Sequence, residues 1–300
     1  MLRRNLSRRQ YLLGLLLAMG SALGFSTKAI FVKLSYQYGV DAVTLLALRM
    51  SFSLPVFLAA AVHGYWSRQQ PALRARDYGL VFLLGFCGYY LSSLFDFLGL
   101  QYISASMERL VLFLYPTLVL ALSALWLGRR CGFKEICALA LSYSGIAVVF
   151  ASDVEIQAEH FWLGVGLVFA STISYALFLI GAGQSIARIG AARFTALGMT
   201  VACGFVLLQF ALTHPWRDLL TRPEVYRYGF GMAMLATVAP VFMLAAAIRR
   251  IGSAHTSLVG MLGPVATLLM AHWILGEALT FPQLAGAALV LAGVLQLGRR

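Results

Sequence analysis

Five charged residues lie inside long apolar segments, where they could bind a substrate or exchange a proton: Lys28, Arg49, Asp96, Glu108 and Arg109. A charge in hydrocarbon costs about 2.5 to 3.5 kcal/mol even on insertion scales, so such residues face a cavity or a partner. One interpretation is structural, with ion pairs that hold helices together or close an external opening. Another is functional: the surplus cation receives a carboxylate or phosphate, or Asp96 or Glu108 takes up and releases a proton. For Lys28, a third is that its long side chain reaches the lipid headgroups.

Aromatic and proline residues form a second set of candidates. Tyr89, Tyr115 and Tyr175 could line a cavity for a substrate, although interfacial or packing roles are equally open. Pro116 and Pro264 each remove a backbone N–H inside an apolar segment and can free a carbonyl to face a cavity. Proline kinks are also common packing features of membrane helices, so both interpretations stand.

The motifs of enzymes and metal sites are missing from the sequence. It has no H-E-x-x-H, no G-x-S-x-G, no G-x-x-x-x-G-K-[ST] and no paired carboxylates in an exposed loop. Its four cysteines show neither a C-x-x-C nor a Cys/His ligand spacing. We therefore expect no catalytic residue, metal or cofactor, and no ATP-driven pump.

The elements that must position these residues are apolar helices. Of 300 residues, 61% are hydrophobic and only 11% are charged, against about 25% charged in a soluble domain. The apolar residues lie in runs about twenty long, the length that crosses a bilayer core as a helix. The sequence predicts an all-α membrane protein with ten transmembrane helices: Tyr11–Leu34, Ala42–Val62, Tyr78–Gly99, Ser104–Trp126, Glu135–Ser152, Trp162–Ala187, Phe194–Thr213, Tyr228–Ile248, His255–Leu275 and Phe281–Leu297.

The distribution of basic residues predicts the orientation, since Lys and Arg in short loops stay on the cytoplasmic side. With a cytoplasmic N-terminus, that side collects 16 of the 23 Lys and Arg residues, and three more lie inside spans. The four outside are Lys33, Arg217, Arg222 and Arg227. Both termini are therefore expected to be cytoplasmic, and the net charge of +12 reflects topology rather than nucleic-acid binding.

The chain contains an internal duplication. Ile103 to Ile146 aligns without a gap onto Ile251 to Val294, which places Pro116 on Pro264. The first spans match more weakly, with Ser21 on Ser171 and Phe25 on Tyr175. Glu108 and Arg109 fall on Thr256 and Ser257, so the charges are not duplicated. Because each half has five spans, the second enters the membrane from the opposite face, giving an inverted repeat typical of carriers.

These motifs resemble the EamA branch of the drug/metabolite transporter superfamily. The resemblance rests on a first-span Gly24-Phe25-Ser26 step and on two halves whose fourth span has a central proline before a Leu-Gly turn: Tyr115-Pro116-Thr117 to Leu127-Gly128, and Gly263-Pro264-Val265 to Leu275-Gly276-Glu277. It identifies 11–152 and 162–297 as two EamA-like five-helix repeats. One departure is that the family's Gly-Glu turn is present as Gly276-Glu277 but replaced by Gly128-Arg129 in the first half.

The resemblance implies a ten-helix exporter, expected in the bacterial inner membrane, and we expect a monomer. Its substrates would be small metabolites, often amino acids or related compounds, moved by alternating access through a site lined by the first, third, fourth, sixth, eighth and ninth spans. Protons are a candidate coupling ion, and the expected partners are the small-molecule substrate and the lipid bilayer. The alternatives are an uncoupled facilitator or channel, or an intramembrane sensor.

Overall fold

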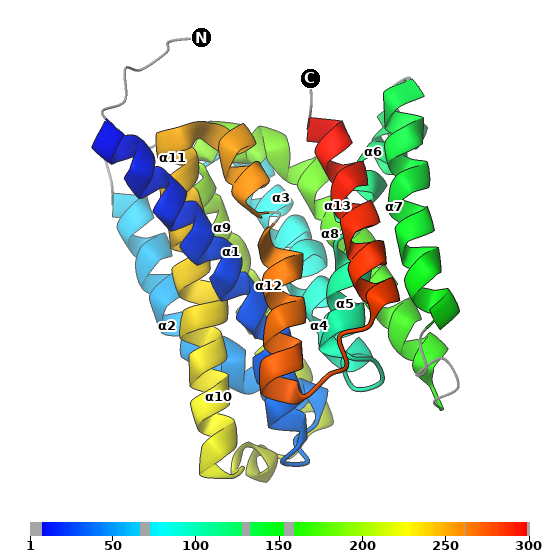
Figure 1. Ribbon diagram of the computed structural model, residues 1–300. Helices are drawn as coiled ribbons and strands as arrows, with labels where there is room; N and C mark the ends of the chain where they lie inside the picture. Colours follow the sequence, from blue (N-terminus) through cyan, green and yellow to red (C-terminus); the bar gives the residue numbers. More distant parts are fainter. Residues whose placement is uncertain (1–7, 67–72, 128–132, 153–158, 261, 299–300) are drawn as a thin grey trace.

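Each of the ten apolar segments predicted from the sequence overlaps helical structure. The computed structural model describes residues 8–66, 73–127, 133–152, 159–260 and 262–298, and the regular structure in these ranges is entirely helical. Helices are the expected outcome, because a segment in lipid must satisfy its backbone hydrogen bonds internally. The start of α1 and the end of α13 lie at the same end of the bundle (Figure 1).

The helices of the first half run from residue 8 to residue 152. They are α1 (Arg8–Tyr36), α2 (Ala42–Trp66), α3 (Ala75–Gly85), the π-helical turn η1 (Phe86–Leu91), α4 (Ser92–Gly99), α5 (Ala105–Leu112), α6 (Tyr115–Leu127) and α7 (Phe133–Ser152).

The second half begins at residue 161. It contains α8 (Phe161–Ile189), α9 (Ala191–Thr213), the short 3₁₀ helix η3 (Trp216–Leu219), α10 (Pro223–Ala233), the π-helical turn η4 (Met234–Val238), α11 (Ala239–Gly260), α12 (Leu262–Met270), the π-helical turn η5 (Ala271–Leu275) and α13 (Phe281–Gly298).

Seven helical stretches of the described chain are long and apolar enough to cross a membrane. They are Arg8–Tyr36, Ala42–His63, Ala75–Gly99, Ala105–Leu122, Phe161–Ala182, Ala191–Thr213 and Pro223–Ile248. Two shorter apolar helices follow, at Leu262–Leu275 and Phe281–Gly293.

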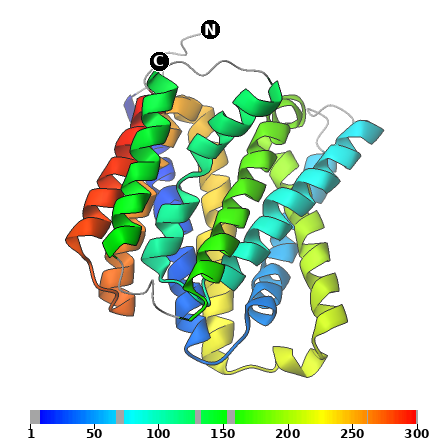
Figure 2. The same ribbon diagram turned by 90° about the vertical axis from the view of Figure 1, so that its right-hand side faces the viewer.

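The two halves are interleaved rather than side by side. α1 packs along α11 and α12, α2 along α9, α4 along α8, and α7 along α13. The α7–α13 pair is visible at one edge of the bundle in both views (Figure 1, Figure 2). Every one of these pairs joins a helix of the first half to a helix of the second, so neither half encloses the core alone.

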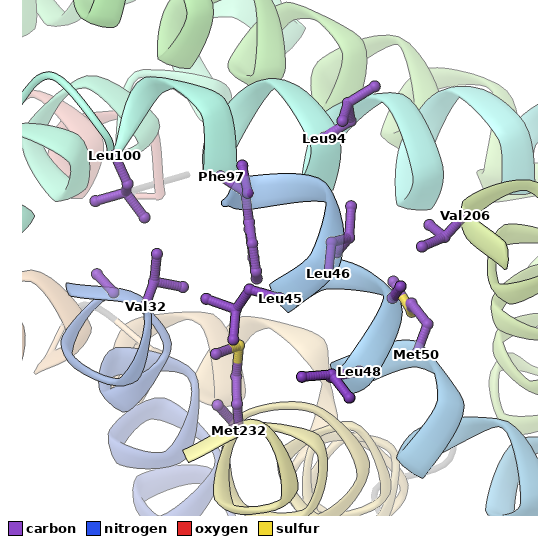
Figure 3. Packing of buried hydrophobic residues seen from close by; sticks show 14 of the residues in the cluster. Val32, Leu45, Leu46, Leu48, Met50, Leu94, Phe97, Leu100, Val206 and Met232 are labelled. Carbon is purple, nitrogen blue, oxygen red and sulfur yellow. The ribbon is translucent and has the colours of Figure 1, made fainter. Parts of the chain in front are cut away.

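The largest buried cluster lies where α1, α2, α4, α9 and α10 meet. Leu45, Leu46 and Met50 of α2, Phe97 of α4 and Met232 of α10 are 0% exposed (Figure 3). Lipid tails are as apolar as these side chains, so the cluster stabilises the fold through close van der Waals packing rather than through exclusion of water.

The predicted helix Ser104–Trp126 is interrupted in the structure. α5 ends at Leu112 and α6 begins at Tyr115. Pro116 has no N–H to donate to the carbonyl four residues earlier, that of Leu112, and its ring would clash there. In the second half Pro264 lies in α12 (Leu262–Met270), and residue 261, which precedes this helix, lies outside the described residues.

The sequence also predicted a non-helical connection between Ile248 and His255. That prediction was wrong, because α11 is helical from Ala239 to Gly260. The connection contains no proline, and its one glycine, Gly252, lowers helix stability without breaking the helix.

Two π-helical turns occupy equivalent places in the third span of each half. η1 begins at Phe86 and η4 at Met234, and these residues are separated by the same interval as Ile103 and Ile251. A π-helical turn inserts an extra residue into the helix, redirects neighbouring side chains and often accompanies a functional site.

Candidate functional site

Lys28 on α1 forms ion pairs with two carboxylates from different helices. Its Nζ lies 2.7 Å from Oδ2 of Asp96 on α4 and 3.0 Å from Oε1 of Glu108 on α5. The side chains of Asp96 and Glu108 are 3% and 0% exposed, whereas that of Lys28 is 19% exposed. We call these three residues the Lys28 site. Lys28 is the partly exposed residue of the three. Because both contacting oxygens lie close to the same Nζ atom, the two carboxylates also lie close to each other.

The outer oxygens of both carboxylates are buried without a hydrogen-bond partner. Within the described residues, neither Oδ1 of Asp96 nor Oε2 of Glu108 accepts a hydrogen bond. A buried carboxylate oxygen without a donor carries a substantial desolvation cost. The Lys28 site therefore holds two incompletely satisfied acids around one cation.

The second half of the chain holds the N-terminus of α5. Ser104 caps the helix, its Oγ accepting from the Met107 N–H at 3.3 Å. The Glu277 carboxylate accepts from the N–H groups of Ala105 at 2.7 Å and Ser106 at 3.0 Å, and from the Ser106 hydroxyl at 2.6 Å. Negative charge at a helix N-terminus is favourable, so Glu277 fixes the helix that carries Glu108.

Sequence reasoning noted Glu277 as part of a family turn but did not assign it this contact. The turn depends on Gly276, whose φ of 72° lies in the left-handed region that favours glycine. Its predicted counterpart, Gly128-Arg129, lies outside the described residues.

Arg49 on α2 is buried against neutral groups. Its Nε donates to Oγ1 of Thr237 in η4 at 3.1 Å, and its guanidinium carbon lies 5.3 Å from the centre of the Phe97 ring. Nη1 is buried and has no hydrogen-bond partner in the part of the chain that is described. Asp96 interacts with Arg49 electrostatically, without an ion pair at contact distance.

Arg109 on α5 connects the first half to α12. Its Nε donates to Oγ1 of Thr267 at 2.9 Å, and its Nη2 donates to the carbonyl oxygen of Phe25 at 2.8 Å. Thr267 is 0% exposed. The guanidinium fork thus holds α1, α5 and α12 together close to Pro264.

The five intramembrane charges predicted from the sequence form an alternating row. The order is Arg49, Asp96, Lys28, Glu108 and Arg109, because Lys28 contacts both acids while Arg49 interacts electrostatically with Asp96 and Arg109 with Glu108. Alternation places each carboxylate between two cations and leaves one surplus positive charge. Among the described residues, only Lys28 forms ion pairs in this row.

Two of the three candidate tyrosines contact a phenylalanine that the sequence analysis did not single out, and the third contacts one of these tyrosines. Phe178 on α8 lies 4.8 Å from Tyr89 and 5.7 Å from Tyr175, and Tyr175 lies 5.5 Å from Tyr115, measured between ring centres. The internal repeat could have identified Phe178, because Phe178 follows Ser171 by the same interval as Lys28 follows Ser21.

Two serines make equivalent hydrogen bonds across the halves. The Ser21 hydroxyl on α1 donates to the carbonyl of Pro240 at 2.8 Å, and the Ser171 hydroxyl on α8 donates to the carbonyl of Ser92 at 2.7 Å. The sequence repeat pairs Ser21 with Ser171, and the interval of its ungapped segment, that between Ile103 and Ile251, pairs Ser92 with Pro240. Each first span therefore bonds to a residue that closely follows the π-helical turn of the other half.

A second pair of equivalent close contacts lies about one helical turn farther along α1 and α8. Ser174 on α8 donates to the carbonyl of Cys87 at 2.7 Å. Its counterpart on α1 is Gly24, and a Cβ added there would lie 2.7 Å from the carbonyl oxygen of Leu235. Cys87 and Leu235 are themselves separated by the repeat interval, so both first spans approach the opposite π-helical turn closely.

These features define a multi-pass α-helical membrane protein. The model of the EamA-like transporter family matches residues 12–151 and again residues 162–299. The chain therefore belongs to the EamA-like transporter family, in agreement with the sequence resemblance.

Named relatives are also transporters. "Uncharacterized transporter YcbK" of Bacillus subtilis (strain 168) is 27% identical over 273 residues, covering 87% of this chain and 85% of the relative. An "Uncharacterized transporter" of Archaeoglobus fulgidus is 22% identical over 265 residues, covering 88% and 90%. A solved structure titled "Crystal structure of protein" superposes with a TM-score of 0.64 at 19% identity, covering 95% and 96% of the two chains, which shows a shared fold. The chain is a membrane transporter.

Proposed function

We propose that this protein is a ten-span carrier made of two inverted five-helix repeats, which exports small metabolites by alternating access. The observation that carries the proposal is the pair of equivalent hydrogen bonds, Ser21 to Pro240 and Ser171 to Ser92. Equivalent contacts in opposite halves are what a pseudo-two-fold axis requires. A carrier with such an axis can exchange the conformations of its halves, opening first to one side and then to the other.

The local geometry supports movement at these contacts. Each serine bonds close to a π-helical turn, and the fourth span of the first half is interrupted before Pro116. Such irregular backbone is tolerated at membrane depth where it is buried in protein or lines a cavity. Both features are places at which a helix can bend without losing all of its hydrogen bonds.

Orientation, location and substrate class are proposed from the sequence. The basic residues favour cytoplasmic termini, and the family favours the bacterial inner membrane and amino acids or related compounds as cargo. The interleaved packing of the two halves supports a monomer as the transporting unit.

Counterflow in proteoliposomes tests the proposal. The purified chain is first screened by thermal shift against amino acids, nucleosides and polyamines, since a ligand that binds the native state raises apparent stability. Radiolabelled uptake of the best ligand is then measured with and without unlabelled ligand inside the vesicles. Faster uptake with internal ligand is expected of a carrier. Uptake that does not respond indicates a channel, and ligand binding without any flux indicates a sensor.

A further inference from the structure

We propose that Asp96 and Glu108 share one exchangeable proton, and that its uptake releases Lys28 from one carboxylate while the other still holds it. The proposal deepens the transporter function proposed above, because it names the ion that would drive the carrier and the group that binds it. It rests on the geometry of the Lys28 site.

The buried carboxylates of the Lys28 site are suited to binding a proton rather than a larger ligand. The carboxyl oxygens of Asp96 and Glu108 are sealed from solvent, and the two outer oxygens have no partner among the described residues. A metal ion or a substrate needs several ligands and a cavity of its own volume, whereas a proton needs one lone pair. The outer oxygens supply that lone pair, and the Lys28 side chain, which is partly exposed, marks the side from which water can reach it.

Within the three side chains of the Lys28 site one bound proton balances the charges, while Arg49 and Arg109 add positive charge on either side. One ammonium cannot neutralise two carboxylates in a low-dielectric interior, and two carboxylates around one site resist simultaneous ionisation. With one proton the three side chains are neutral together. Transfer from water converts one carboxylate to a carboxylic acid and breaks its ion pair with Lys28. Release of the proton to water restores the pair.

The neighbouring charges are fixed and cannot replace Lys28. The charged and titratable groups facing the site are Lys28 and Tyr36 on α1, Arg49 on α2, Asp96 on α4, and Glu108 and Arg109 on α5. Arg49 is held by Thr237, and Arg109 by Thr267 and the Phe25 carbonyl. The residues through which η4 and α12 contact the two arginines, Thr237 and Thr267, are therefore neutral.

Proton uptake would act on the contact between α1 and α4. Lys28–Asp96 links these helices, together with the hydrogen bond from the Tyr36 hydroxyl to the Phe97 carbonyl at 2.6 Å. Lys28–Glu108 links α1 to α5 instead. Protonation of Asp96 would thus loosen α1 from α4 and leave it attached to α5.

Infrared spectroscopy of the full chain in proteoliposomes tests the proposal without a known substrate. A protonated carboxylic acid has a C=O stretching band that a carboxylate lacks, so the probe is the proton itself. The wild type should develop one buried-acid band within a titration from about pH 9 to pH 4, and Asp96→Asn or Glu108→Gln should remove or displace it. Glu159→Gln is the matched control, because the Glu159 side chain is 89% exposed, and it should leave this band unchanged. A wild type without the band, or a band unaffected in both variants, would overturn the proposal.

Lys28→Met supplies a second test, in which the acid band should become more persistent instead of being lost. Without the ammonium, two facing carboxylates hold the shared proton more tightly, and the band should persist to a pH at least about one unit higher. An unchanged midpoint in this variant overturns the proposal, whereas Lys28→Arg, which keeps the charge, should titrate close to the wild type. These titrations do not depend on transport. Counterflow without the band refutes the proton site alone, and the band without any flux refutes the carrier alone.

Discussion

Lys28 and Phe178 occupy equivalent positions in the two halves, each following the serine that bonds to the opposite third span. Lys28 contacts two carboxylates, whereas Phe178 packs against Tyr89 and Tyr175. The backbone contacts of the two halves are thus similar while their side-chain chemistry differs. A carrier built this way would close one side through charges and the other through aromatic packing, so only one closure would respond to pH.

The proposed topology predicts the location of reporters. A fusion at the C-terminus and an insertion at Arg74 should both read cytoplasmic, and an insertion at His160 should read external. The reason is the excess of basic residues on the side that carries the termini. Enzyme reporters that are active on only one side of the membrane provide the measurement. A cytoplasmic result at His160 would contradict the inverted ten-span arrangement.

The close approach of η1 to α8 predicts a sensitive glycine. A Cβ at Gly88 would lie 2.2 Å from Cγ of Phe178, so Gly88→Ala must displace the ring. Overpacking of this kind costs about 1 to 3 kcal/mol, and the apparent melting temperature should fall by several degrees. Gly204→Ala in α9 is the control, because a Cβ there meets no atom within 4 Å. Equal melting temperatures for the two variants would show that Phe178 is not held in this position.

The cap made by Glu277 predicts a coupling between the halves. Glu277→Ala leaves the N–H groups of Ala105 and Ser106 without their acceptor, at a cost of about 1 to 3 kcal/mol for each buried group. Glu277→Ala and Ser106→Ala should destabilise the protein less in combination than the sum of their separate effects, because they share one contact. Thermal unfolding of the two single variants and the double variant measures this coupling. Fully additive effects would contradict the contact.

The hydrogen bonds of the Arg109 guanidinium predict that lysine cannot replace arginine at this position. An ammonium cannot donate to Thr267 and to the Phe25 carbonyl with the geometry of a planar fork. If Arg109 also contacts substrate, Arg109→Lys should weaken binding of an anionic or zwitterionic ligand, while the protein still inserts and stays monodisperse. The paired neutral variant, Arg109→Gln with Glu108→Gln, separates this role from charge balance. Normal ligand affinity in the paired variant would remove Arg109 from the binding site.

Coupling through the Lys28 site predicts a loss of pH-driven transport. In Asp96→Asn vesicles, an imposed pH gradient should no longer raise substrate accumulation above the level without a gradient, because an amide does not titrate. Glu159→Gln vesicles should keep the wild-type response. Uptake is measured with the gradient imposed in both directions. A full response in Asp96→Asn would show that this carboxyl does not carry the coupling proton.

The sequence alone determined the kind of protein, the approximate helices and the duplication. Runs of about twenty apolar residues have few alternatives in a bilayer, and Pro116 indicated where the fourth span of the first half is interrupted. It also singled out the five charges, since an intramembrane charge is costly wherever it lies. These inferences depend on local composition and on spacing along the chain.

Only the tertiary structure decided which of these residues meet. The sequence left open whether Arg49 and Arg109 pair with the acids. The structure instead places them against Thr237 and Thr267, because the halves interleave and bring η4 and α12 to the arginines. The contact of Glu277 with α5 has the same origin. Packing between distant helices selects the partner of each polar group, and no local pattern in the sequence records that choice.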